Sequence, residues 1–115
     1  MSKDSLLNFN DEQMQDIVEI IGDRLSEEIQ NDNNLHNADV YQAAIDIATL
    51  LSGASVFLAA SFEIWRVTHT KKVEEIRQKA KENGITLKEQ AIDEIISYVA
   101  KYMGYVYPPI KQESE

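Results

Sequence analysis

Residues 47–62 decide the fold of this chain, and they read Ile47-Ala-Thr-Leu-Leu-Ser-Gly-Ala-Ser-Val-Phe-Leu-Ala-Ala-Ser-Phe62. The stretch contains neither a charged residue nor a proline. A helix that is apolar on all sides has to be buried, either inside a protein core or in lipid. The sequence therefore leaves two interpretations open, a central helix of a bundle and a membrane span.

Amphipathic segments on both sides of this stretch favour the bundle. Each repeats apolar residues at spacings of three and four and needs an apolar surface to cover, which a central helix provides. We therefore predict an all-α fold, a small four-helix bundle-like domain with an apolar central helix. It forms a single helical domain over 1–104, followed by an extended, Pro-containing tail over 105–115. The predicted helices span about 11–30, 39–66, 71–83 and 87–104.

Capping residues support these boundaries. A residue with a short polar side chain, followed three positions later by Glu or Gln, is typical of a capping box at a helix start. This pattern occurs in Asn10 with Gln13, Asp39 with Gln42, and Thr86 with Glu89. Phe9 and Met14 are spaced for a hydrophobic staple around the first box. We expect a break near 67–70, where β-branched residues crowd and Thr70 can cap a new helix, and an end at Asn83-Gly84.

The alternative interpretation is a membrane span over 44–65. Tyr41 and Trp65 bracket this segment as interfacial anchors would, and most of the basic residues follow it. Residues 1–40 would then lie outside an inner or plasma membrane, with the C-terminus in the cytoplasm. The bundle interpretation predicts a cytoplasmic protein instead, since the first residues do not read as a secretory signal.

Small residues form a narrow ridge along the predicted central helix. They are Ala44, Ala48, Ser52, Ser55 and Ala59. Such a ridge lets another helix approach closely. We expect helix packing there, or a homodimer if the ridge is left uncovered within one chain.

Charge is strongly segregated along the chain. The 115 residues carry 11 Lys and Arg against 20 Asp and Glu, a formal net charge of −9. Residues 1–40 hold two basic residues and ten acidic ones, whereas residues 66–81 hold six basic residues and two acidic ones. An acidic protein repels phosphate, so we expect no direct binding of nucleic acid.

Acidic residues recur on one face of the first predicted helix. They are Glu12, Asp16, Glu19, Asp23 and Glu27, at steps of three and four. This face could bind the basic surface of another protein, or it could imitate the phosphates of DNA. The simpler interpretation is a solvated helix face lying near the basic segment.

Other polar residues receive structural interpretations. Glu63 with Arg66 and Glu75 with Lys79 are spaced to pair along a helix. Asp46, Glu63 and Arg66 flank or enter the apolar stretch, and the alternative to a structural ion pair there is a buried carboxylate with a raised pKa. The aromatic residues of 105–110 either dock back on the bundle or face a partner.

Little in the sequence suggests catalysis or a bound cofactor. The chain has no cysteine and only two histidines, His36 and His69, which share no metal-ligand spacing. Residues 32–39 are rich in oxygen ligands but lack the Gly and Glu of a calcium loop. We find no Gly-rich phosphate loop and no paired-carboxylate motif. We therefore predict no enzyme, no metal and no cofactor.

The expected function is a non-enzymatic, helical protein-binding module, an adaptor or a small inhibitor, that uses the acidic face. The first alternative is a single-span membrane protein with an acidic N-terminal head and a basic cytoplasmic helix. A weaker alternative is a DNA-mimic inhibitor of a nucleic-acid-binding protein. The expected partner is a protein with a basic surface, and a homo-oligomer is also considered.

Overall fold

The computed structural model describes residues 9–29, 37–53, 55–58 and 60–110, with the backbone alone described for 37, 38, 55 and 56. This part of the chain contains α2 (Asp11–Glu28), α3 (Asn37–Leu51), the short α4 (Ser55–Leu58), α5 (Phe62–Glu82) and α6 (Glu89–Tyr102). None of the described residues lies in a β-strand. The predicted all-α, bundle-like fold is confirmed.

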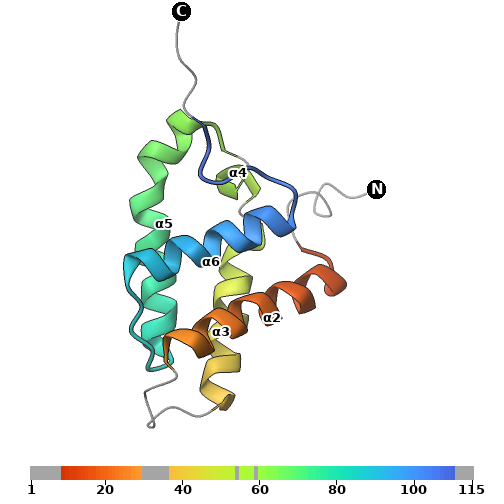
Figure 1. The fold of residues 1–115 in the computed structure, drawn as a ribbon, viewed down its shortest axis with the longest axis vertical. Helices are drawn as coiled ribbons and strands as arrows, with labels where there is room; N and C mark the ends of the chain where they lie inside the picture. Colours follow the sequence, from red (N-terminus) through yellow and green to blue (C-terminus); the bar gives the residue numbers. More distant parts are fainter. Residues whose placement is uncertain (1–8, 30–36, 54, 59, 111–115) are drawn as a thin grey trace, which may run out of the picture.

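The four longer helices form a closed ring of contacts. α2 packs against α3 and α6, and α5 packs against the same two helices from the other side. Figure 1 shows α2 and α6 side by side and antiparallel, running across α3 and α5. Each helix therefore has two large neighbours and buries one side of its surface between them.

A single apolar core fills the centre of this ring. Among the described residues, every fully buried side chain is hydrophobic. The largest of them are Ile17, Ile21, Leu25, Ile47, Leu51, Leu58, Ile76, Ile85, Ile92, Ile95, Ile96 and Val99. They come from all five helices and from the α5–α6 connection, so the core is shared by the whole bundle.

The predicted helix over 39–66 is wrong. α3 ends at Leu51, and Gly53 follows with a φ of 85°, a conformation that costs glycine little because it has no Cβ. The uncharged stretch is thus divided among α3, α4 and the start of α5. The span considered over 44–65 would need an unbroken helix there. Among the described helices, none is both long enough and apolar enough to cross a membrane.

The predicted break near 67–70 is also wrong. α5 runs without interruption from Phe62 to Glu82, so its basic part belongs to one helix of 21 residues. Its buried residues, Val73, Ile76 and Ala80, all lie in its second half, whereas Trp65 of the first half packs against the core while partly exposed. The helix predicted to begin at 71 therefore begins nine residues earlier.

Of the three predicted capping boxes, the structure contains only the first. At α2, the Asn10 side chain accepts a hydrogen bond from the Gln13 backbone N–H, and the Gln13 side chain accepts one from the Asn10 backbone N–H, which confirms the capping box. The other two boxes are wrong. Asp39 lies inside the first turn of α3, and α6 is preceded by Lys88, whose side chain makes no capping bond.

Glycines end both α5 and α6 in the same way. Ile85 donates its backbone N–H to Ala80 across Gly84, and Tyr105 donates to Ala100 across Gly104. Both glycines have positive φ, as a Schellman ending requires. The predicted end at Asn83-Gly84 is confirmed.

The segment after α6 returns to the bundle. Tyr107 is only 7% exposed and joins the core, whereas Val106 and Ile110 are exposed. The aromatic residues of 105–110 were expected either to dock on the bundle or to face a partner, and Tyr107 docks on the bundle.

Two glycines allow a matched test of backbone conformation. Gly22 lies inside α2, and an added Cβ would meet only the Ala44 Cβ, at 3.9 Å, which is ordinary contact. We expect Gly22→Ala to raise the free energy of unfolding by about 0.5–1 kcal/mol, because alanine favours helix. Gly104→Ala should lower it by about 1–2 kcal/mol, since φ is +89° although space is open. Urea denaturation measures the free energy of unfolding of both variants. Changes of the same sign would contradict the different roles assigned to Gly22 and Gly104.

Candidate functional site

Five of the seven acidic residues of α2 recur at steps of three and four along its exposed side. The side chains of Glu12, Asp16, Glu19, Asp23 and Glu27 are exposed, opposite the buried residues of the same helix. We call these five residues the acidic face. Its position follows from the helical repeat, because the stripe that enters the core leaves the opposite side to solvent.

Two members of the acidic face already have partners in the bundle. Asp16 accepts a hydrogen bond of 2.6 Å from the Tyr102 hydroxyl of α6. Glu27 pairs with Arg24 at 2.7 Å, and the same guanidinium also contacts Glu28 and, on α6, Glu94. Arg24 therefore joins α2 to α6.

The other three members, Glu12, Glu19 and Asp23, have no basic partner among the described residues. Four of the six Lys and Arg residues of α5 pair within their own helix instead. The pairs are Glu63 with Arg66, Lys72 with Glu75, Glu74 with Arg77, and Lys79 with Glu82. The charge of the basic segment is thus largely matched inside α5, and the acidic face keeps three uncompensated carboxylates.

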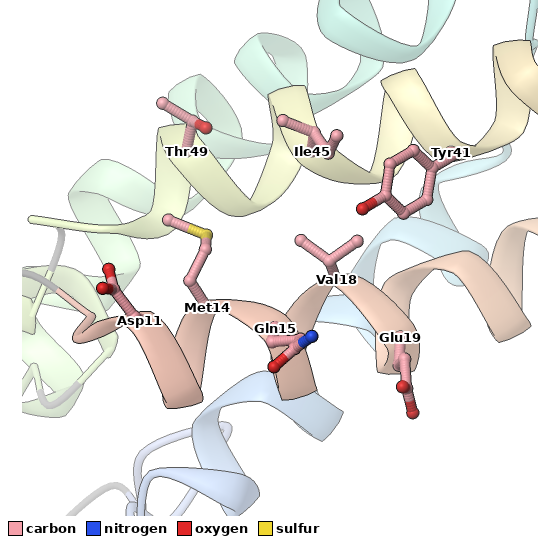
Figure 2. Close-up of a pocket in the computed structure, with 8 residues that line it drawn as sticks. All are labelled: Asp11, Met14, Gln15, Val18, Glu19, Tyr41, Ile45 and Thr49. Atoms are coloured by element: carbon pink, nitrogen blue, oxygen red, sulfur yellow. The ribbon is translucent and has the colours of Figure 1, made fainter.

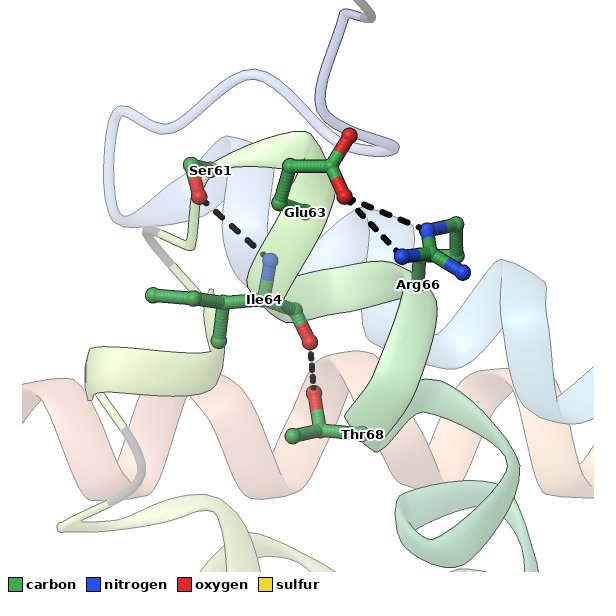
Figure 3. Close-up of polar contacts among 5 residues, drawn as sticks. All are labelled: Ser61, Glu63, Ile64, Arg66 and Thr68. Atoms are coloured by element: carbon green, nitrogen blue, oxygen red, sulfur yellow. Dashed lines mark hydrogen bonds and ion pairs between the residues drawn. The ribbon is translucent and has the colours of Figure 1, made fainter.

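Figure 3 shows how the first turns of α5 organise one of these pairs. Ser61 caps the helix by accepting the Ile64 backbone N–H, and Glu63 meets the Arg66 guanidinium at 3.0 Å. The Thr68 hydroxyl donates to the Ile64 carbonyl, so its polar group is satisfied within the helix. The predicted Glu63–Arg66 pair is confirmed, whereas Glu75 pairs with Lys72 rather than with Lys79.

A groove of about 390 Å³ lies beside the acidic face, between α2 and α3. In Figure 2, Met14 and Val18 point from α2 toward α3, while Glu19 points away to the outer side. Tyr41 of α3 also lines the groove and is 62% exposed. Asp11 adds a carboxylate at one end. The groove therefore offers apolar contact next to negative charge.

The predicted ridge of small residues is only partly present. Ala44 and Ala48 are fully buried within the chain, so they offer no surface to a second copy. Ser52 lies just after α3, where its hydroxyl accepts the Phe9 backbone N–H at 3.0 Å. The side chain of Ser55 and the whole of Ala59 lie outside the described residues. The homodimer remains a prediction, and these two alanines do not support it.

The pKa of Asp46 is lowered, which contradicts the alternative of a buried carboxylate with a raised pKa at this position. Hydrogen bonds from Asn83 and Gln42 hold the pKa of this carboxyl below its ordinary value, and the charge of Lys79 acts in the same direction. Asp46 therefore serves as an ionised acceptor that ties α3 to the end of α5.

A second cluster was not predicted from the sequence. Trp65 and His69, one turn apart on α5, stack with ring centroids 4.7 Å apart, and the Trp65 indole donates to the Tyr107 hydroxyl at 3.0 Å. His69 Nε2 lies 2.7 Å from an Asp93 oxygen of α6. The spacing of four between Trp65 and His69 is the one local signal of this cluster, since Asp93 and Tyr107 are distant in sequence.

Within the described part of the chain, no group of three or more His, Asp and Glu side chains is arranged to bind a metal ion. His36 and most of the loop over 32–39 lie outside the described residues.

Comparison with protein-family models, curated proteins and solved structures finds no match for this chain. Function is therefore inferred from the geometry of these surfaces.

The Asp16–Tyr102 contact can be tested by titration. The hydrogen bond to Asp16 and the nearby negative charge raise the pKa of Tyr102 to about 12. We expect Asp16→Asn to return the pKa of Tyr102 toward its ordinary value of about 10. Ultraviolet absorbance of the tyrosinate measures it. Asp23→Asn, on the same face, is the control, and an equal shift in both variants would contradict a specific contact.

The Asp46 contacts predict a pH dependence of stability. A carboxyl with a lowered pKa stabilises the fold above its ordinary pKa of about 4, and the contribution disappears as pH falls. We expect Asp46→Asn to lower the free energy of unfolding by about 1 kcal/mol at about pH 7. Near pH 2–3 the variant and the wild type should unfold alike. Asp23→Asn should change stability by less than about 0.5 kcal/mol at either pH. A deficit of Asp46→Asn that persists in acid would contradict the role of charge.

Proposed function

We propose that the protein is a non-enzymatic binding module, an adaptor or a small inhibitor, that engages a basic surface of another protein through the acidic face of α2. One observation carries the proposal: Glu12, Glu19 and Asp23 are exposed without a basic partner among the described residues, while four of the six Lys and Arg residues of α5 pair inside α5. Uncompensated surface charge of one sign attracts a partner of the opposite sign.

The groove between α2 and α3 supports the same proposal. Charge alone speeds association and selects orientation, but contact with apolar groups supplies most of the binding free energy. Met14 and Val18 lie along the groove, and Tyr41 provides an exposed aromatic ring. A basic segment that also carries an apolar side chain would match both features.

The DNA-mimic alternative is less well supported by the same geometry. A mimic of the phosphate backbone needs a regular row of free negative charges. Here the row is interrupted, because Tyr102 binds Asp16 and Arg24 binds Glu27. Three separate carboxylates beside an apolar groove suit a protein surface better.

Two variants with the same change in charge test the proposal. The first replaces Glu12, Glu19 and Asp23 by Gln, Gln and Asn. The second replaces Glu63, Glu74 and Glu82 of α5 by Gln, and exposed ion pairs of this kind contribute little to stability. The probe is a synthetic helical peptide of lysine and leucine, labelled for fluorescence anisotropy. At low salt we expect the first variant to bind about tenfold more weakly than the wild type, and the second to bind about as well as the wild type.

Equal loss of affinity in the two variants would show that net charge alone attracts the peptide. That result would overturn the acidic face as a binding surface. Raising the ionic strength should remove most of the difference between wild type and the first variant, because exposed charges are screened.

A further inference from the structure

A cleft of about 620 Å³ lies between α5, α6 and the segment after α6, away from the groove beside the acidic face. Its volume falls within the range of small-molecule sites, roughly 300–1,000 Å³. Aromatic rings from two elements line one part of it, and carboxylates of α6 line another.

The aromatic part of the cleft is held in a fixed arrangement. Trp65 stacks on His69, and it meets Tyr107 edge to face, with ring centroids 6.3 Å apart and an angle of 82°. The indole N–H is bound to the Tyr107 hydroxyl, and His69 is bound to Asp93. Tyr107 is anchored in the core, where burial raises its pKa to about 12 and so keeps the ring neutral. These rings would lose little freedom when a ligand binds.

Apart from His69, every ionisable Asp, Glu, Lys or Arg side chain that lines the cleft is a carboxylate. Glu89, Asp93 and Glu94 line it, and none of the described residues that line it is a lysine or an arginine. Glu94 is already paired with Arg24, and the Asp93 carboxylate is the acceptor of the contact with His69 Nε2. Glu89 is exposed and has no basic partner among the described residues.

These features select the chemistry of a ligand. The face of an aromatic ring is negative and attracts cations, most strongly for tryptophan. A nearby carboxylate adds to this attraction, and a cleft of this size is too large for a bare metal ion. We propose that the cleft between α5, α6 and Tyr107 binds an organic ammonium group, with Trp65 against its apolar methyl or methylene groups and Glu89 and Asp93 near its charge.

Such a group can come from a free small molecule or from a modified lysine side chain of a protein. Both present the same trimethylammonium head. Choline serves as the probe for the first source, and a short peptide containing trimethyllysine serves as the probe for the second. Whichever binds more tightly identifies the source.

The chain contains one tryptophan, Trp65, so its fluorescence reports on this cleft directly. We expect choline to change the emission in a saturable manner and to bind about tenfold more tightly than 3,3-dimethylbutanol, its uncharged isostere. Isothermal titration calorimetry gives the same comparison without the fluorophore. Equal affinity for the two compounds, or no saturable binding of either choline or the peptide, would overturn the proposal.

Two exposed carboxylates provide a matched pair of variants. Glu89→Gln removes a charge from the cleft and should weaken choline binding several-fold, whereas Glu19→Gln removes the same charge from α2 and should leave it unchanged. Trp65→Leu should abolish binding by calorimetry, with circular dichroism to verify the fold. Equal affinity of Glu89→Gln and Glu19→Gln for choline would show that the cleft does not bind the cation.

Discussion

The left-handed backbone of Gly53 is the constraint on which the helix arrangement depends. It follows directly on the end of α3 and allows the uncharged stretch to change direction. Because of this change, α5 runs antiparallel to α3 rather than continuing its line (Figure 1). The apolar residues on both sides of the turn, such as Leu51 and Leu58, then enter one core. An unbroken helix would have carried the residues of α5 away from α3, against which they pack.

How much the sequence could predict depended on periodicity. α2 and α6 were predicted to within two residues at each end, because each alternates a buried stripe with polar residues. The middle of the chain has no such contrast. Without charges, one buried helix and two helices joined by a turn have the same sequence pattern, and neither Gly53 nor Ser61 alone distinguishes the two. Tertiary packing decided between them.

In the candidate sites, too, local spacing could be predicted from the sequence and long-range contacts could not. The acidic face could be located from the sequence, because its spacing alone places five side chains on one side of a helix. The hydrogen bond from Tyr102 to Asp16, which interrupts this face, could not be predicted, since the two residues are 86 positions apart. The aromatic cleft depends on contacts of the same kind, over 24 and 42 positions. The ion pairs of α5 are partly predictable. Spacing shows which residues can pair, but several partners lie three or four residues away, and only packing selects among them.

The pairing of α2 with α6 also has a consequence for how the chain folds. Roughly sixty residues separate the end of α2 from the start of α6, so this contact closes a loop that contains α3 and α5. Contacts of such long sequence separation slow folding, because the entropy of the loop is lost before the contact is gained. During synthesis α2 finds α3 early, but its other neighbour is complete only once Tyr102 has left the ribosome. Until then, the part of α2 that will face α6 stays exposed to water.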